Sequence, residues 1–292
     1  MTEHDKTVVI TGASSGFGEG AAKAFADKGY RVWGTMREAE GRNAKKRAAL
    51  EAYSPNVSVV DVDIARDESV ALGFAEILNA GPVDVLINNA GIMYLGITEA
   101  FSVAQAHEQM NTNYYGAIRT IQAVLPAMRA ARSGLIINCS STVGRISPPF
   151  FGTYTATKHA LEGYSQALRY EVAPFGVDVA IVEPGPFGTG LLASGRKPAL
   201  DDVLSSYGDL AQVPPTMARQ FAQMLTSDDA PDPKWVVDAY LKLEELPAGK
   251  RPVRTQVGIS WGVDEINRLT QPIQDGVLEK MQLEDVLGGA DI

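Results

Sequence analysis

The sequence predicts an α/β fold in which a doubly wound parallel sheet of about seven strands carries helices on both faces. Short β-branched or apolar runs alternate with longer helical patterns along most of the 292 residues, which is typical of such a sheet. The first two runs are joined by a glycine-rich turn and a helix, which makes a right-handed βαβ unit. No internal repeat, low-complexity block or linker interrupts the chain, so we expect a single domain over residues 1–292.

The expected elements follow from apolar periodicity and from the residues that end each run. The expected strands cover residues 7–11, 30–35, 56–62, 83–87, 135–139, 177–182 and 252–257. The expected helices cover residues 19–28, 68–80, 103–132 and 234–246, together with one through Tyr154 that ends near residue 173. Pro126 predicts a kink or break in the long helix, because proline cannot donate a helical hydrogen bond.

The regular alternation ends after Pro186. Residues 187–230 are rich in glycine, serine, proline and aspartate, and a loop region this long inside a domain is usually functional. We therefore expect a substrate-binding lid there. Residues 258–292 are interpreted as a C-terminal extension, with a helical tail from Glu265 that frays at Gly288 and Gly289.

Composition excludes several classes of function. The net charge of −9 argues against nucleic acid, whose phosphates need a basic surface. The single cysteine, Cys139, rules out an internal disulfide and a cysteine-cluster metal site, and His4, His107 and His159 show no ligand spacing, so we expect no metal. The polar N-terminus resembles no signal peptide, and no apolar run approaches the ~20 residues of a membrane span. We expect a soluble cytoplasmic protein.

The turn after the first strand has the spacing G-x-x-x-G-x-G, formed by Gly12, Gly16 and Gly18. Glycines allow a ligand to approach the backbone closely, and the helix that follows directs free N–H groups toward a pyrophosphate. Ser14 and Ser15 add hydroxyl donors. A purely structural tight turn is the alternative, and the flanking strand and helix favour dinucleotide binding in a Rossmann-type fold.

The end of the second strand predicts which dinucleotide binds. Enzymes that use NAD place an acidic side chain there for the ribose 2′-hydroxyl, whereas this strand continues into Thr35, Met36 and Arg37. The planar guanidinium of Arg37 suits a 2′-phosphate, so NADP(H) is preferred and NAD(H) remains an alternative. In the competing interpretation, Arg37 is a solvated residue of a charged loop beside Glu38.

Tyr154 and Lys158 lie four residues apart, with Ser141 thirteen residues before the tyrosine. On a helix this spacing places both side chains on one face. A phenol titrates near ~10, and a neighbouring ammonium lowers that pKa toward the range useful for acid/base chemistry. The spacing alone favours an ordinary exposed helix face, and the functional interpretation depends on the other motifs of the chain.

Six motifs together resemble the short-chain dehydrogenase/reductase family in order and spacing, over residues 7 to about 190. They are Thr11–Gly18, Asn88–Gly91, Asn113, Ser141, the pair Tyr154 and Lys158, and Pro184–Gly185. The C-terminal third resembles the family only loosely. The resemblance implies an NAD(P)-dependent oxidoreductase that acts on CH–OH groups.

The resemblance implies a role for each matching position. Tyr154 would be the general acid/base, and Lys158 would lower its pKa and bind the nicotinamide ribose. Ser141 would donate a hydrogen bond to the substrate oxygen. Asn113 would hold a water that links Lys158 to solvent, and its alternative interpretation is a kink or capping residue.

The resemblance also implies a set of cofactor contacts around the glycine turn, the adenosine and the nicotinamide. They are Gly12, Ser14, Ser15, Gly16, Phe17, Gly18, Arg37, Asp63, Ile64, Asn89, Ala90, Gly91, Tyr154, Lys158, Pro184, Gly185, Phe187 and Thr189. Asp61 competes with Asp63 for the adenine contact, and the family register favours Asp63.

The residues expected to line the substrate pocket are largely apolar. They are Met93, Tyr94, Val143, Pro148, Pro149, Phe150, Phe151, Phe187, Leu191 and Leu192. We therefore expect a hydrophobic or aromatic ketone or secondary alcohol, although several of these residues could belong to the core. A regulator without catalysis is disfavoured because Tyr154 and Lys158 are both present. The glycine spacing disfavours epimerisation or dehydration. The resemblance further implies a homodimer or homotetramer.

Overall fold

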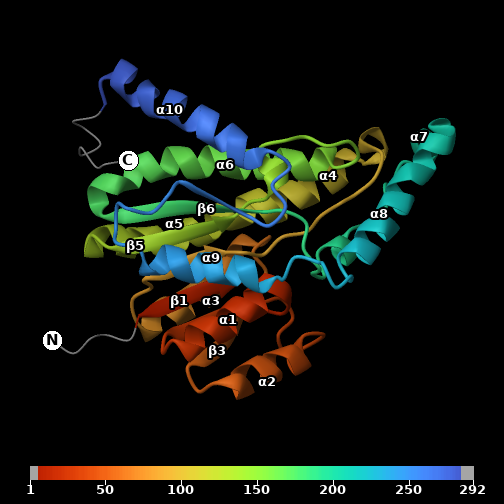
Figure 1. Cartoon of the computed structure of the whole chain (residues 1–292). Helices are drawn as coiled ribbons and strands as arrows, with labels where there is room; N and C mark the ends of the chain where they lie inside the picture. The colour runs from red at the N-terminus through yellow and green to blue at the C-terminus, as the bar shows by residue number, and fades with distance from the viewer. Residues whose placement is uncertain (1–5, 284–292) are drawn as a thin grey trace.

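Seven parallel strands form one sheet in the order β3-β2-β1-β4-β5-β6-β7, in a computed structural model that describes residues 6–283 (Figure 1). The order reverses between β1 and β4, as in doubly wound sheets. The strands are β1 Thr7–Thr11, β2 Arg31–Met36, β3 Val57–Asp61, β4 Val85–Asn88, β5 Gly134–Cys139, β6 Val177–Pro184 and β7 Arg254–Val257. The predicted fold class is confirmed.

Helices cover both faces of this sheet (Figure 1). They are α1 Gly16–Asp27, α2 Ala44–Tyr53, α3 Asp67–Ala80, α4 Val103–Met110, α5 Gly116–Ala131, α6 Gly152–Val172, α7 Asp201–Ser206, α8 Val213–Met224, α9 Lys234–Glu245 and α10 Val263–Met281. The sequence did not predict α2. This helix buries Leu50 and leaves most of its other side chains exposed, so it lacks an apolar stripe.

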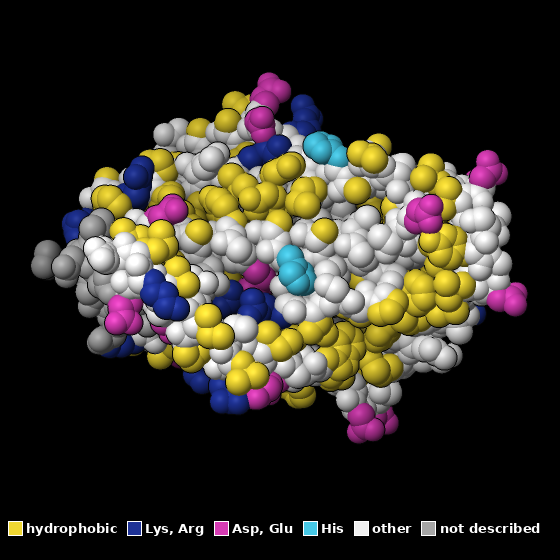
Figure 2. Space-filling model, turned by 90° about the horizontal axis from the view of Figure 1, so that it is seen from above, with side chains coloured by type: hydrophobic (Ala, Val, Ile, Leu, Met, Phe, Trp, Pro, Cys, Tyr) yellow, Lys and Arg dark blue, Asp and Glu magenta, His cyan; other side chains and the backbone are white. Residues whose placement is uncertain are grey.

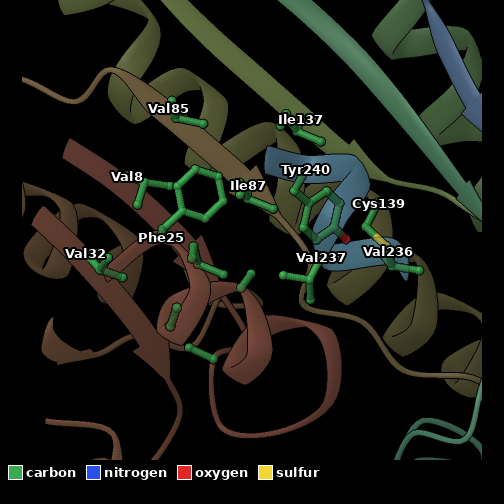
Figure 3. Close-up of a cluster of buried hydrophobic side chains, with 14 of the residues drawn as sticks. Val8, Phe25, Val32, Val85, Ile87, Ile137, Cys139, Val236, Val237 and Tyr240 are labelled. Carbon is green, nitrogen blue, oxygen red and sulfur yellow. The ribbon is translucent and has the colours of Figure 1, made fainter. Parts of the chain in front are cut away.

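Two hydrophobic layers hold the helices to the sheet. One lies between the sheet and helices α1 and α9, and it includes Phe25, Val236 and Tyr240 (Figure 3). The other lies on the opposite face, where Phe74 of α3 and Ile121 of α5 pack against the strands. The two layers cover the two faces of the sheet, which leaves the ends of the strands free to build a site.

The long helix predicted over residues 103–132 is interrupted, but not at Pro126. A π-helical segment, Asn111–Tyr115, separates α4 from α5, and the N–H of Gly116 donates to the carbonyl of Asn111. Pro126 lies on an exposed position inside α5. On the solvent side, the carbonyl that loses its partner can bind water, so the helix continues past the proline.

The region expected to be a lid contains more helix than predicted. Residues 187–230 include α7, α8 and two short 3₁₀ turns, Leu192–Ser194 and Gly208–Gln212. Exposed apolar side chains in this region include Leu210 and Val213. Figure 2 shows hydrophobic side chains gathered on the side of the molecule where α7 and α8 lie.

Residues 263–281, which belong to the expected C-terminal extension, form α10, and the fraying expected at Gly288 and Gly289 lies outside the described residues. Helix α10 is tied to the last strand, since Arg254 of β7 donates to the side chain of Gln271 at 3.2 Å. Within residues 6–283, every helix is too short or too polar to cross a membrane.

Candidate active site

A cleft of about 540 Å³ lies at the carboxyl ends of the strands. Most of the residues predicted from the sequence line it. They are Gly12, Ser14, Ser15, Gly16, Phe17, Arg37, Asp63, Ile64, Asn89, Ala90, Gly91, Ser141, Tyr154, Lys158, Pro184, Gly185, Phe187 and Thr189. Gly18 and Asn113 lie outside the lining. The fold therefore brings residues from both halves of the chain to one cleft.

The glycines of the first turn serve two different needs. Gly12 has φ +71°, and a Cβ there would lie 2.8 Å from Cα of Ala90. Gly16 has φ +58° and begins α1, so free N–H groups of the first helical turn lie beside the cleft. A Cβ on Gly18 would lie 2.4 Å from the carbonyl oxygen of Gly12. Gly12 and Gly16 thus shape the cleft, whereas Gly18 permits close packing behind it.

Asn89 fixes the end of β4 to the end of β1. Its side-chain amide donates to the carbonyl of Thr11 at 3.0 Å, and its N–H donates to the Thr11 hydroxyl at 3.0 Å. The N–H of Ala90 donates to the same hydroxyl at 3.1 Å. Because the amide nitrogen of Asn89 is held by the backbone, the acceptor Oδ1 is the side-chain atom left for a ligand.

The two competing aspartates have different surroundings. The carboxylate of Asp61 accepts hydrogen bonds from the N–H groups of Glu38 at 3.0 Å and Ala39 at 2.8 Å. Asp61 therefore holds the loop after β2. Asp63 lines the cleft together with Ile64. This arrangement favours Asp63 over Asp61 as the residue that faces the adenosine end.

Three cations line the end of the cleft next to β2: Arg37, Arg42 and Lys46. The amide of Asn43 donates to the carbonyl of Arg37 at 2.6 Å and so fixes the start of the loop. Of the three, only Arg37 was predicted from the sequence, because Lys46 belongs to the unpredicted helix α2. The run of basic residues that begins at Arg42 was the feature of the sequence that could have indicated further cations in the cleft. Glycine-lined backbone, free helix N–H groups and these cations together fit the phosphates of a dinucleotide.

Tyr154 and Lys158 occupy successive turns of α6 and are both 5% exposed. The ammonium of Lys158 donates to the carbonyl of Cys139 at 2.8 Å and lies 5.7 Å from the centre of the Tyr154 ring. Ser141 follows β5, and its hydroxyl donates to the carbonyl of Pro184 at 3.3 Å. The Ser141 hydroxyl also lies near enough to the Tyr154 hydroxyl to lower its pKa. The structure thus brings together the serine, tyrosine and lysine that the sequence predicted.

Burial controls the protonation of this pair. It raises the pKa of Tyr154 above the ordinary phenol value, and the hydrogen bond with Ser141 acts in the opposite direction. Burial also lowers the pKa of Lys158, and the neighbouring Cys139 and Glu162 oppose that shift. We expected Lys158 to lower the pKa of Tyr154, but the net shift is upward because the cost of burying a phenolate dominates. Tyr154 is therefore a protonated hydrogen-bond donor at neutral pH.

Asn113 lies in the π-helical segment and is 2% exposed. Its Oδ1 accepts from the N–H of Ile92 at 2.8 Å. Its amide nitrogen donates to the carbonyl of Ile92 at 2.8 Å and to the hydroxyl of Thr157 at 3.0 Å. Both amide hydrogens are thus used within the protein, so this side chain joins the wall after Gly91 to α6. A relay water on this side chain would have to donate to Oδ1.

The substrate side of the cleft is apolar. The predicted residues that line it are Met93, Val143, Phe151, Phe187, Leu191 and Leu192, whereas Tyr94, Pro148, Pro149 and Phe150 do not. Tyr94 is 1% exposed and stacks on Phe101, with ring centres 5.7 Å apart, so it belongs to the core.

Three residues that were not predicted from the sequence close this side of the cleft. Phe221 and Leu225 come from α8 and the residue after it, and Trp261 precedes α10. The ring centre of Phe221 lies 6.4 Å from those of both Phe151 and Trp261. These residues were not predicted because they lie far along the chain from the recognised motifs. The available signals were two aromatic side chains, Phe221 in the expected lid and Trp261 in the expected C-terminal extension.

Comparison with known proteins agrees with this geometry. The chain is 39% identical over 203 residues to a 3-ketodihydrosphingosine reductase of Bacteroides thetaiotaomicron, which covers 69% of this chain and 71% of the relative. It is 32% identical over 282 residues to retinol dehydrogenase 8 of Bos taurus, covering 87% and 90%. A crystal structure of a short-chain dehydrogenase from Streptomyces avermitilis superposes over 100% of both chains, with a TM-score of 0.73 and 32% identity.

Other solved structures of this fold contain NADP⁺ or NAD. The short chain dehydrogenase family model matches residues 6–199, which include the glycine turn, Ser141, Tyr154 and Lys158. The chain therefore belongs to the short-chain dehydrogenase/reductase family and is an oxidoreductase of that family.

Proposed function

We propose that this protein transfers a hydride between NADP(H) and an apolar carbonyl compound or the matching alcohol, either a ketone with its secondary alcohol or an aldehyde with its primary alcohol. The observation that carries the proposal is the placement of Ser141, Tyr154 and Lys158 in the same cleft as the glycine turn of α1. NADPH, when bound, supplies the hydride to the carbonyl carbon. The residues of the chain then have to orient the carbonyl, deliver a proton and exclude water.

Each of the three residues has a distinct task in carbonyl reduction. The Ser141 hydroxyl donates a hydrogen bond to the carbonyl oxygen, where negative charge develops. Tyr154 donates its phenolic proton to that oxygen, which completes the alcohol, and the resulting phenolate is stabilised by the nearby Lys158 ammonium. In alcohol oxidation the phenolate takes the same proton back. The burial of Tyr154 keeps the proton in place until a substrate arrives.

The cations at the adenosine end support NADP(H) over NAD(H). Arg37, Arg42 and Lys46 line that end, and Arg42 also pairs with Glu38 at 3.3 Å. A charge-assisted hydrogen bond to a phosphate contributes about 1.5–3 kcal/mol. We expect Arg37→Asp to lower kcat/KM for NADPH about 10- to 100-fold and to leave kcat/KM for NADH unchanged or raised. If the ratio of the two values does not move, the 2′-phosphate does not bind here.

The apolar wall supports a lipid-like substrate. Met93, Phe151, Phe221 and Trp261 surround the space beside the reaction centre. One relative is named for 3-ketodihydrosphingosine and another for retinol, and both molecules join an extended apolar body to a carbonyl or hydroxyl group. We therefore take 3-ketodihydrosphingosine with NADPH and retinol with NADP⁺ as the first two probes.

Tyr154→Phe tests the reaction itself. The variant removes the phenolic proton and keeps the ring, so we expect turnover of either probe to fall at least about 1,000-fold while NADPH binding stays within twofold. The matched control is Tyr170→Phe, since Tyr170 is buried on the same helix and lies outside the cleft lining. NADPH absorbance gives the rate, and fluorescence titration gives the affinity. Equal rates in wild type and Tyr154→Phe would refute the acid/base role.

We also propose that the protein assembles as a homodimer or homotetramer through α6. The exposed side of α6 carries small residues, Ala156, Gly163 and Ala167, and a Cβ on Gly163 would meet nothing within 4 Å. Small side chains let two helices approach closely. Sedimentation velocity should show at least a dimer for wild type and a smaller species for Ala167→Arg. A monomeric wild type contradicts the assembly.

A further inference from the structure

The side chain of Asn267, in α10, binds two segments that reach the reaction centre. Its Oδ1 accepts a hydrogen bond from Nε of Arg145 at 2.9 Å, and its Nδ2 donates to Oε2 of Glu183. Thr270, one turn later, accepts from the other end of the Arg145 guanidinium at 2.6 Å. Through the single amide of Asn267, helix α10 thus holds both the guanidinium of Arg145 and the carboxylate of Glu183.

The segment of Arg145 contains the donor, and the segment of Glu183 the acceptor, of the hydrogen bond made by the Ser141 hydroxyl. Arg145 ends a tight turn that begins at Ser141, where the N–H of Gly144 donates to the carbonyl of Ser141 at 2.8 Å. Glu183 directly precedes Pro184, whose carbonyl accepts from the Ser141 hydroxyl at 3.3 Å. A shift of either segment would therefore move the serine donor relative to the nicotinamide side of the cleft.

The surroundings of Glu183 make the amide of Asn267 hard to replace. Glu183 is 0% exposed, and Arg254 lies between it and a second buried carboxylate, at 3.6 Å from Glu183 and 2.9 Å from Glu162. Burial and the charge of Glu162 raise the pKa of Glu183, whereas Asn267, Arg254 and Arg145 lower it. A neutral amide accepts from the arginine and donates to the carboxylate at the same time, and an ionised carboxylate cannot do both.

Glu162 extends this network to the catalytic helix. Tyr154, Lys158 and Glu162 follow each other at four-residue spacing, so they lie on one face of α6. Among the described residues, Oε1 of Glu162 and Oε1 of Glu183 have no hydrogen-bond partner. Because an incompletely satisfied buried network is costly, the hydrogen bonds that these two carboxylates do make are important.

We propose that Asn267 is a positioning residue that holds the turn after Ser141 and the end of β6 in register for the reaction. This inference rests on the proposed function, since it assigns the residue to that same site. It also gives a task to α10, which lies beyond residues 6–199 that the family model matches.

The test compares Asn267→Ala, Asn267→Asp and the neighbouring Arg268→Ala. Arg268 is exposed and pairs with Glu265, so its removal perturbs the surface of the same helix but not the network. The measured quantities are kcat and KM with 3-ketodihydrosphingosine or retinol, the Kd for NADPH, and the folded fraction. We expect kcat of Asn267→Ala to fall about 10- to 100-fold with the Kd for NADPH within twofold, because misplacement of a reacting group by about 1 Å has that effect.

Asn267→Asp adds a readout that a merely structural role would not move. The variant keeps the acceptor for Arg145 and loses the donor to Glu183 unless one proton is shared between the two carboxyls. Its kcat relative to wild type should therefore recover toward pH 6 and fall toward pH 9. Arg268→Ala should match wild type at both values.

The proposed function and the positioning role of Asn267 predict different outcomes if either is wrong. Absence of turnover in wild type and in Arg268→Ala contradicts the proposed function. Normal turnover in those two proteins, with unchanged kcat per folded molecule in both Asn267 variants, contradicts the positioning role. A loss of rate in Asn267→Ala that tracks the folded fraction, with no pH dependence in Asn267→Asp, contradicts it as well.

Discussion

Replacing Asn113 with alanine tests whether this residue is a structural tie or a binding site for water. The substitution removes three hydrogen bonds from a side chain that is 2% exposed. Two of the partners keep another bond, since the carbonyl of Ile92 also accepts from Gln109 at 3.2 Å and the Thr157 hydroxyl donates to the carbonyl of Tyr154 at 2.7 Å. The N–H of Ile92 is the group that loses its side-chain acceptor.

The expected loss of stability follows from the hydrogen bonds that are lost and retained. An unsatisfied N–H costs about 1–3 kcal/mol, and the space left by the amide adds a smaller cavity contribution. We expect Asn113→Ala to lower the free energy of unfolding by about 2–4 kcal/mol. The matched control is Asn111→Ala in the same π-helical segment, which loses one bond to the carbonyl of Ala65 at 3.0 Å and should cost about 1 kcal/mol.

Urea unfolding followed by circular dichroism measures both variants, with and without NADPH. The structural tie predicts that the difference from wild type persists in both conditions, because Ile92 belongs to the protein wall and not to the cofactor. If Asn113→Ala unfolds within about 0.5 kcal/mol of wild type while kcat falls steeply, the reasoning is wrong and a water held by this side chain becomes the better account.

Three further predictions follow from burial and close packing. Because burial raises the pKa of Tyr154, the rate of reduction should be constant between pH 6 and 9. The rate of oxidation, which needs the phenolate, should rise about tenfold per pH unit. Equal slopes of the two initial-rate profiles against pH would contradict this. Gly18→Ala should lower stability by about 1–3 kcal/mol in urea unfolding, because its Cβ would lie 2.4 Å from the Gly12 carbonyl, and Gly276→Ala in α10, whose Cβ would meet nothing within 4 Å, should not destabilise. Phe221→Ala should raise KM for 3-ketodihydrosphingosine or retinol about tenfold and leave turnover of a small ketone such as acetone unchanged, and equal changes for both would contradict an apolar wall.

The parts of the site that the sequence predicted are those fixed by local rules. The glycine turn must have small residues where the chain takes positive φ, so Gly12 and Gly16 are visible in the sequence. Tyr154 and Lys158 share a helix, and four-residue spacing alone places them on one face. The strands that lead into Asn89 and Ser141 are largely apolar runs, as buried parallel strands are.

The parts that the sequence did not predict depend on contacts between distant segments. Helix α2 packs through Leu50 and otherwise faces solvent, so its pattern did not identify Lys46 as a residue of the cleft. Tyr94 is adjacent in sequence to Met93, yet only Met93 lines the cleft, because successive residues of the chain point in different directions. Phe221 reaches the cleft from a segment in which no motif could be recognised.

The upward pKa shift of Tyr154 changes the interpretation of the tyrosine and lysine pair. A lysine that only lowered the phenol pKa would make Tyr154 a base at neutral pH, and burial of 95% of its surface prevents this. The ammonium of Lys158 is more useful after proton transfer, when it faces a new phenolate in the same buried space. Burial then favours the tyrosine as a proton donor, and the lysine limits the cost of the anion that donation leaves behind. Under this reasoning, the two residues act in sequence during reduction, and the network from Glu162 to Asn267 keeps the serine donor aligned while they do so.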